Sequence, residues 1–372
     1  MKKVMVLAGT RPEAIKVAPV VLAMRKSDIL QPVLCSSGQH REMLAQALGD
    51  FGLSPDMDMD VMQAGQGLSQ LSARLFTSVD KAICDVKPDC ILVQGDTTTV
   101  AIASMCGYYN GVTVAHLEAG LRSHNKRSPF PEEVNRRIAG IVADIHFAPT
   151  QKGKDNLVAE GVDPADVFIV GNTVIDALAI TRASLDAEKA VLPGEIREQI
   201  KQGRKMILVT GHRRESFGDG FLNICRAIKQ LADKYPDVFM VYPVHLNPQV
   251  QQPVYDILGG HERIFLTSPL GYREFVAHML ESHLVLTDSG GVQEEAPAFG
   301  KPVLVMRDVT ERVEGLSAGT ARLVGTTIGG ITAGVSELLD SEARYLDMAR
   351  SANPYGDGTA AAQVVSILES CL

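Results

Sequence analysis

Short runs of aliphatic residues alternate with amphipathic stretches along almost all of the 372 residues, and this alternation is the strongest constraint on the fold. Most of the short runs lack strict polar–apolar alternation, which predicts strands covered on both faces. The order strand–helix–strand–helix favours parallel sheets with helices on both sides. The predicted strands are Val4–Ala8, Pro32–Ser36, Cys90–Gln94, Thr113–Leu117, Ile145–Ala148, Val167–Val170, Met206–Thr210, Val238–Tyr242, Ile264–Leu266, Leu284–Thr287 and Pro302–Val305.

The alternating pattern runs twice, which predicts two doubly wound α/β domains facing a deep cleft. The first set covers roughly residues 1–168, and the second begins near Met206 after a polar stretch. Residues 170–175 form the predicted hinge. Ligands of open parallel sheets bind at the carboxyl ends of the strands, so the residues that follow each strand are the candidates for a site.

The composition excludes several classes of protein. The chain is 45% hydrophobic and 22% charged, which is ordinary globular usage. A net charge of −8 argues against a nucleic-acid partner, and no apolar run is long enough to predict a membrane span. Six cysteines without metal-ligand spacing indicate buried thiols in a cytoplasmic protein, with no metal site. No G-x-G-x-x-G motif follows a strand, which argues against NAD.

The first predicted strand leads into Gly9-Thr10-Arg11-Pro12-Glu13. Arg11 is expected at a helix N-terminus, where free N–H groups favour an anion, and Lys16 lies about one turn further along. The alternative is ordinary capping with a solvated Arg11. The loop that contains Gln39 follows the second strand, and capping is as good an interpretation of it as binding.

Carboxylates follow three strand or helix boundaries of the first half. Asp96 ends one strand, Glu118 is expected beside His116 at the next, and Glu132 and Glu133 open a helix. Each alone has an alternative interpretation as a helix cap or a favourable dipole contact. Three such sites in one half favour acid–base chemistry, because neighbouring carboxylates separate one another's pKa values.

The second half carries two polar strand ends of a different kind. His212 and Arg213 follow one strand, with an exposed basic loop as the alternative, and His245 follows another as a weaker signal. The sharpest signal is the turn Ser289-Gly290-Gly291, which opens a helix and suits a phosphate, with Glu295 placed for a vicinal diol. A carboxylate-rich half and a phosphate-plus-diol half together predict a nucleotide-sugar ligand.

At these positions the sequence resembles the bacterial non-hydrolysing UDP-N-acetylglucosamine 2-epimerases. The matching segments include GTRPEAIKVAP, GQHREML, GDTTT, HLEAGLRS, SPFPEEVNRR, TGHRRESFG and TDSGGVQEEAP, in order and nearly from end to end. The resemblance implies the GT-B architecture, with Rossmann-like domains over residues 1–170 plus a returning helix at 359–372, and over 171–358. It also implies a homodimer that interconverts UDP-GlcNAc and UDP-ManNAc for cell-surface polysaccharide.

The resemblance assigns roles to matching positions. It implies a diphosphate site at Arg11, Ser289, Gly290 and Gly291, a ribose contact at Glu295, catalytic residues at Asp96, Glu118, Glu132 and His212, and an allosteric UDP-GlcNAc site that includes Gln39, Arg213 and His245. The family's T-E-R-P-E segment reads Thr310-Glu311-Arg312-Val313-Glu314 here. The missing proline is expected to relax the backbone that presents Arg312 to the substrate.

The expected chemistry is elimination of UDP to 2-acetamidoglucal and re-addition, which needs neither NAD nor metal. Loss of UDP from C1 makes the C2 proton acidic, and inversion requires one acid–base group on each face. The alternatives are a GT-B glycosyltransferase, a hydrolysing epimerase that releases ManNAc, and a non-catalytic nucleotide-sugar sensor.

Overall fold

The computed structural model describes residues 1–38, 41–63, 65–187 and 191–372 and divides the chain into two compact units. Unit 1 comprises Met1–Ile180 and Tyr355–Leu372, and unit 2 comprises Thr181–Pro354. The first boundary falls ten residues beyond the predicted one because it lies inside a continuous helix, α7 (Thr173–Ala187), whose first half packs in unit 1. No helix of the described residues is both long and apolar enough to cross a membrane.

Unit 1 is built on a seven-stranded parallel sheet in the order β3-β2-β1-β4-β5-β6-β7. Its strands are β1 (Lys2–Ala8), β2 (Leu30–Ser36), β3 (Met57–Asp58), β4 (Cys90–Gln94), β5 (Thr113–Leu117), β6 (Ile145–Ala148) and β7 (Val167–Ile169). The central strand β4 is buried along its whole length, as its unbroken apolar run predicts.

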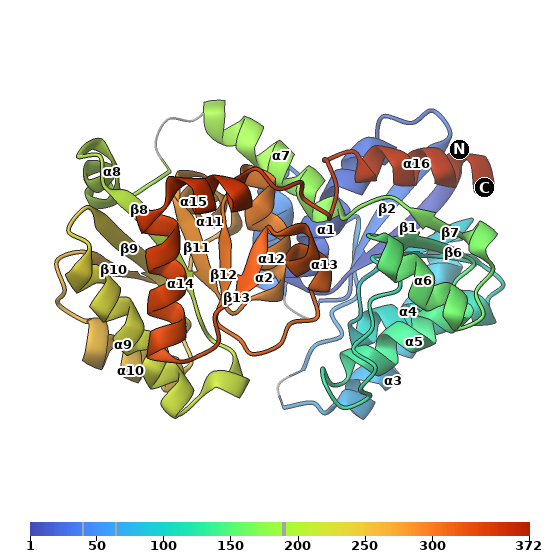
Figure 1. Ribbon diagram of the computed structural model, residues 1–372. Coiled ribbons are helices and arrows are strands. Elements are labelled where there is room, and N and C mark those ends of the chain that lie inside the picture. Colours follow the sequence, from blue (N-terminus) through green and yellow to red (C-terminus); the bar gives the residue numbers. More distant parts are fainter. Residues whose placement is uncertain (39–40, 64, 188–190) are drawn as a thin grey trace. The chain divides into compact units, whose positions relative to one another are not determined.

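Helices cover both faces of this sheet. Buried side chains of α3, α4 and α5 form a core against β1 and β4, while α16 packs beside α1 (Figure 1). The helices of unit 1 are α1 (Arg11–Met24), α2 (Arg41–Gly49), α3 (Leu68–Val86), α4 (Thr98–Tyr109), α5 (Glu132–Val142), α6 (Gln151–Ala159), η1 (Pro164–Asp166), the first part of α7, and α16 (Ala360–Cys371). The last helix, α16, therefore belongs to the same unit as the first strand, β1.

Unit 2 is built on a six-stranded parallel sheet in the order β10-β9-β8-β11-β12-β13. Its strands are β8 (Lys205–Thr210), β9 (Val238–Pro243), β10 (Ile264–Thr267), β11 (Leu284–Thr287), β12 (Val303–Val305) and β13 (Ala321–Leu323). Its further helices are α8 (Gly194–Lys201), η2 (Arg214–Ser216), α9 (Asp219–Lys234), α10 (Pro248–Leu258), α11 (Tyr272–Glu281), α12 (Gly290–Glu295), η3 (Ala296–Phe299), α13 (Val313–Ala318), α14 (Ile328–Asp340) and α15 (Glu342–Ala349).

Two separate cores lie on the two faces of the unit 2 sheet. One is formed with α9, α10 and α14, and the other with α8, α11 and α12 (Figure 1). This layering confirms the predicted fold class of two parallel-sheet, Rossmann-like units. The prediction that every cysteine is buried is wrong for Cys84 and Cys371, which are exposed helix residues.

Candidate functional site

The turn from β1 into α1 is fixed by a buried carboxylate. Thr10 is the N-cap of α1, and Glu13 closes a capping box: its Oε2 accepts from the backbone N–H groups of Gly9 (2.9 Å) and Thr10 (2.7 Å). Its Oε1 accepts from the Thr97 hydroxyl (2.6 Å) at the start of α4. Burial raises the pKa of Glu13 despite these hydrogen bonds. Glu13, to which sequence reasoning gave no role of its own, thus ties the turn that carries Arg11 to the next strand end.

Glu118 follows β5 in a strained backbone conformation. Its φ is +64°, a region that non-glycine residues rarely adopt, so strand alternation ends at Leu117 and does not place Glu118 as predicted. Lys16 Nζ lies 2.5 Å from Glu118 Oε2, and the side-chain amide of Gln94 donates to the same oxygen. Lys16, which the sequence assigned to substrate, contacts a candidate catalytic carboxylate in this structure.

His116, in contrast, is a structural residue. It is 1% exposed, and its Nε2 lies 2.7 Å from the Gly95 carbonyl oxygen, to which it donates. Burial lowers the pKa of His116 to about 4. The imidazole therefore stays neutral and supports the turn between Gln94 and Asp96.

Asp96 is held by an arginine rather than by a helix end. Thr97, not Asp96, is the N-cap of α4, which removes the capping interpretation of Asp96. Arg136 donates to Asp96 Oδ2 through Nε (2.9 Å) and approaches it through Nη2 (2.6 Å), and Asn135 donates to the Asp96 carbonyl (2.9 Å). Sequence reasoning missed Arg136, although it lies one turn beyond the paired glutamates on the helix α5.

The two glutamates that open α5 are in different environments. Glu133 is fully buried and accepts from the backbone N–H groups of Ser123 (2.8 Å) and His124 (3.2 Å). Burial opposes its ionisation, but the Ser123 hydrogen bonds and Arg136 outweigh burial and lower its pKa. Glu132 Oε2 is buried and has no hydrogen-bond partner among the described residues. Glu133 is therefore structural, and Glu132 retains an oxygen for a ligand.

In unit 2, the loop after β8 presents His212 and Arg213. Asp288 Oδ2 accepts from both of their backbone N–H groups (2.7 and 2.8 Å), and the Tyr242 hydroxyl donates to the Gly211 carbonyl (2.7 Å). The His212 ring stacks on His245 with 5.2 Å between centroids and 7° between planes. Burial, together with His245 and Arg213, lowers the pKa of His212, while Asp288 opposes that shift.

The Ser-Gly-Gly turn after β11 lies against acidic and basic side chains. Ser289 is the N-cap of α12. A Cβ atom on Gly290 would lie 3.2 Å from Glu311 Oε1 and 3.5 Å from Arg213 Nη2, and one on Gly291 would lie 3.2 Å from Glu295 Oε1. A side chain at either glycine would therefore be tightly packed against these neighbours, and the predicted phosphate contact of the turn stays a prediction.

A cluster of arginines surrounds Glu311 beside this turn. Its carboxylate contacts Arg307 (3.0 Å), Arg312 (3.4 Å) and Arg213 (3.6 Å). Burial opposes ionisation of Glu311, yet these arginines lower its pKa to about 2.

Arg312 also donates to the buried Glu294 (2.6 Å) and occupies the N-cap of α13. Val313 therefore stands at the first helical position, where a proline would fit. Sequence reasoning missed Arg307, although it lies two residues after the predicted strand Pro302–Val305.

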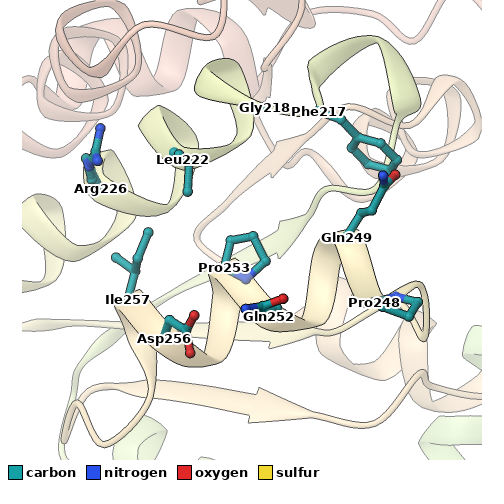
Figure 2. A pocket seen from close by; sticks show the side chains of 10 residues that line it. All are labelled: Phe217, Gly218, Leu222, Arg226, Pro248, Gln249, Gln252, Pro253, Asp256 and Ile257. Carbon is teal, nitrogen blue, oxygen red and sulfur yellow. The ribbon is translucent and has the colours of Figure 1, made fainter.

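Gln39 lies outside the described residues. Among the described residues, no group of three His, Cys, Asp or Glu side chains is placed to hold a metal ion. A pocket of about 510 Å³ in unit 2 lies between α9 and α10 and includes Phe217, Arg226 and Asp256, but none of the predicted site residues (Figure 2).

Two Rossmann-like units, one with carboxylates at its strand ends and one with a glycine-rich turn among arginines, define a nucleotide-sugar enzyme of the GT-B class. Comparison with known proteins gives the particular family. The UDP-N-acetylglucosamine 2-epimerase family model matches residues 22–369. The UDP-N-acetylglucosamine 2-epimerase of Yersinia pestis is 48% identical over 375 residues, with 99% of this chain and 98% of the relative covered.

Solved structures agree with this match. The Neisseria meningitidis UDP-GlcNAc 2-epimerase bound to UDP-GlcNAc is 43% identical to this chain. The alignment covers 100% of each chain, with a TM-score of 0.90. The S. aureus MnaA–UDP co-structure is also 43% identical, covers 100% of this chain and 96% of its own, and has a TM-score of 0.89. The chain belongs to the UDP-N-acetylglucosamine 2-epimerase family, and its activity is the isomerisation of UDP-GlcNAc at C2.

Proposed function

We propose that this chain interconverts UDP-GlcNAc and UDP-ManNAc by eliminating UDP and adding it back within the site. A base removes the C2 proton, the C–H electrons form the C1–C2 double bond, and the C1–O bond breaks to release UDP. The intermediate is 2-acetamidoglucal. Re-addition of UDP with protonation of C2 from the other face inverts the centre. No NAD or metal is needed, because departure of UDP supplies the acidity of C2.

Acid–base groups on two faces of the sugar are assigned to Glu118 and Glu132. Lys16 favours the carboxylate form of Glu118 by direct contact, which suits a base. Glu132 keeps an unpartnered buried oxygen, which suits proton exchange with a ligand. Asp96, engaged by Arg136, serves as a second base or as a charged neighbour. The single observation that carries this assignment is the contrast between Glu132 and the fully engaged Glu133 in one helical turn.

The departing diphosphate is assigned to Arg11, Arg312 and the Ser289 turn, the ribose to Glu295, and proton donation to His212. The Glu311 carboxylate is held by Arg213, Arg307 and Arg312 beside Gly290, so these three arginines can stabilise a negatively charged group next to the turn. The UDP-GlcNAc and UDP in the N. meningitidis and S. aureus structures support the same ligand class here.

The remaining proposals concern the setting of the enzyme. We place it in the cytoplasm as a homodimer that supplies ManNAc units for cell-surface polysaccharide. UDP-GlcNAc also acts as an allosteric activator at a site that includes Gln39, Arg213 and His245. His245 stacks on His212, so a ligand bound at the activator site could act on the proposed proton donor through this contact.

Proton NMR of UDP-GlcNAc with the purified protein in D2O tests the reaction, without added NAD, metal or acceptor. We expect UDP-ManNAc with deuterium at C2, exchange at C2 of the substrate, and traces of glucal and UDP. Accumulation of free ManNAc would show hydrolysis instead. Binding without C2 exchange would contradict the proposal and favour a transferase or a sensor.

A further inference from the structure

Asp288 is a fully buried carboxylate whose two oxygens have separate surroundings. It follows β11 directly and is 0% exposed. Oδ2 accepts the backbone N–H groups of His212 and Arg213, at 2.7 and 2.8 Å. That oxygen fixes the loop after β8, and two charge-assisted hydrogen bonds suffice for this structural task.

The second oxygen has no such task. Asp288 Oδ1 is buried and makes no hydrogen bond among the described residues. The nearest ionisable atom recorded beside it is His212 Nδ1, at 3.6 Å. A buried carboxylate oxygen without a partner is costly, and a small rotation of the imidazole would bring Nδ1–H within hydrogen-bond distance.

The His212 ring is constrained on a second side. The His245 ring stacks on it with the two planes nearly parallel, and His245 Nδ1 accepts from the Asn247 backbone N–H (3.1 Å), which fixes the orientation of the His245 ring. The ring of His212 is thereby held so that Nδ1 faces Asp288. The ionisable groups that act on it are Asp288 after β11, His245 after β9 and Arg213 on its own loop.

We propose that Asp288 is a positioning residue that holds His212 with Nδ1–H directed at its Oδ1, leaving Nε2–H to face the substrate. The inference rests on the proposed role of His212 as proton donor to the departing diphosphate. In the donor step, the Nε2–H proton moves to a phosphate oxygen and the imidazolium becomes the neutral Nδ1–H tautomer. Asp288 Oδ1 accepts the Nδ1–H hydrogen bond before and after donation, which orients the imidazole.

Asp288→Asn separates the two tasks of this side chain. The amide oxygen still accepts from the backbone N–H groups of the loop, while the amide NH2 replaces Oδ1 opposite His212. A donor facing Nδ1 disfavours both the Nδ1–H tautomer and the imidazolium. We expect kcat to fall about 100-fold or more, the usual size of a general-acid contribution, with little change in KM.

The matched control is Asp176→Asn. Asp176 is also buried, accepts a backbone N–H (from Ala361, 2.9 Å) and has its second oxygen without a hydrogen-bond partner among the described residues. Among the partners given for Asp176 in the described part of the chain there is no imidazole. Activity and the His212 signals are expected to be unchanged in this variant.

The test is ¹⁵N NMR of histidine-labelled full-length protein saturated with UDP, with His212 assigned from the His212→Gln spectrum. We expect the neutral wild-type ring to carry its proton on Nδ1, and the Asp288→Asn ring to carry it on Nε2 with a lower titration midpoint. A wild-type ring protonated on Nε2 overturns the proposal even if the variant does not fold. Identical tautomers in wild type and Asp288→Asn overturn it as well.

Measuring kcat beside the His212 tautomer distinguishes failure of this inference from failure of the proposed function. If the tautomer changes and kcat falls, Asp288→Asn should cause no further loss in a His212→Gln background, since it acts only through the imidazole. If the tautomer changes but kcat does not, the contact stands and the donor role of His212 fails. A further loss in the double variant would overturn the positioning role and indicate a structural one.

Discussion

Glu118 combines backbone strain with a defined set of partners. A non-glycine residue at φ +64° costs about 1–2 kcal/mol, and such residues persist where their surroundings over-determine them. Here Ala119 is fully buried, and Lys16 and Gln94 both contact the Glu118 carboxylate. The strain therefore directs one carboxylate out of the strand register, at the point where the proposed chemistry needs it.

Replacing either acid–base candidate should strongly reduce turnover without unfolding the protein. Glu118→Gln and Glu132→Gln are each expected to lose about 100-fold or more in kcat, because each amide keeps the shape but not the proton transfer. Steady-state turnover in both directions measures the loss. Glu160→Gln, which alters an Arg122 ion pair in the same unit, is the control. Near-wild-type turnover in both variants would contradict the assignment.

Glu311 gives a pH signature. Its folded pKa of about 2 lies below the ordinary 4.5, so its contribution to stability is fully present above pH 4.5 and is lost as the pH falls towards 2. Glu311→Gln should lower the melting temperature at neutral pH, and the difference from wild type should shrink between pH 4.5 and 2. Circular dichroism measures this, since the chain has no tryptophan. Glu198→Gln, at an exposed position, is the control, and its melting-temperature difference from wild type should not depend on pH in this way. If the Glu311→Gln difference also stays constant down to pH 3, contacts with the arginine cluster are not its cause.

At the scale of elements, the turn that carries Glu118 depends on one close approach of backbones. Gly120 has φ +89°, and a Cβ atom there would overlap the Gly153 carbonyl of α6. The turn after β5 and the first turn of α6 are therefore in direct contact, and a side chain at this position would separate them.

Gly120→Ala should be destabilising by about 3 kcal/mol or more, because steric overlap adds to the cost of a positive φ. Gly161→Ala is the matched control: Gly161 also has a positive φ, +97°, but nothing lies within 4 Å of its hypothetical Cβ, so only about 1 kcal/mol is expected. Thermal melts of the two variants measure the difference. Equal melting temperatures would show that the close approach is not a constraint.

Elements were more predictable than contacts. Every predicted strand is present because most are short, largely apolar runs, whereas β3 and β13 were missed because segments of two or three residues carry no pattern. The strand ends pointed to Asp96, Glu118 and His212 as candidates, and these assignments stay predictions. The pattern did not single out Arg136, Arg307 or the proposed role of Asp288. Arg136 contacts Asp96, Arg307 contacts Glu215, and Asp288 contacts the loop that contains His212. Each of these contacts joins segments that are far apart in the sequence, and only tertiary packing brings them together.

At the scale of the whole molecule, unit 1 is discontinuous in sequence. Its closing helix α16 buries Val364 and Leu368, and Ser27 after α1 donates to Glu369 (2.5 Å). Asp176 of α7 accepts from the backbone of Ala361. The tail of the chain is thus an integral layer of the unit that holds the carboxylates.

Leu368→Ala should destabilise unit 1 by about 2–5 kcal/mol through lost burial and a residual cavity. The exposed Ser366→Ala on the same helix is the control, with little expected change. Hydrogen exchange with mass spectrometry measures the effect, with faster exchange expected in β1 and α1 and none in the sheet of unit 2. Uniform acceleration across both units would contradict a local role for α16.

The position of α16 also sets an order of events during synthesis. Residues 181–354 leave the ribosome as one continuous segment with all six strands of their sheet, and can fold as soon as they emerge. We expect the N-terminal sheet, although made first, to keep the side of α1 that contacts α16 uncovered until α16 follows. The unit that carries the carboxylates is then expected to mature later in the cell and to be exposed to chaperones for longer.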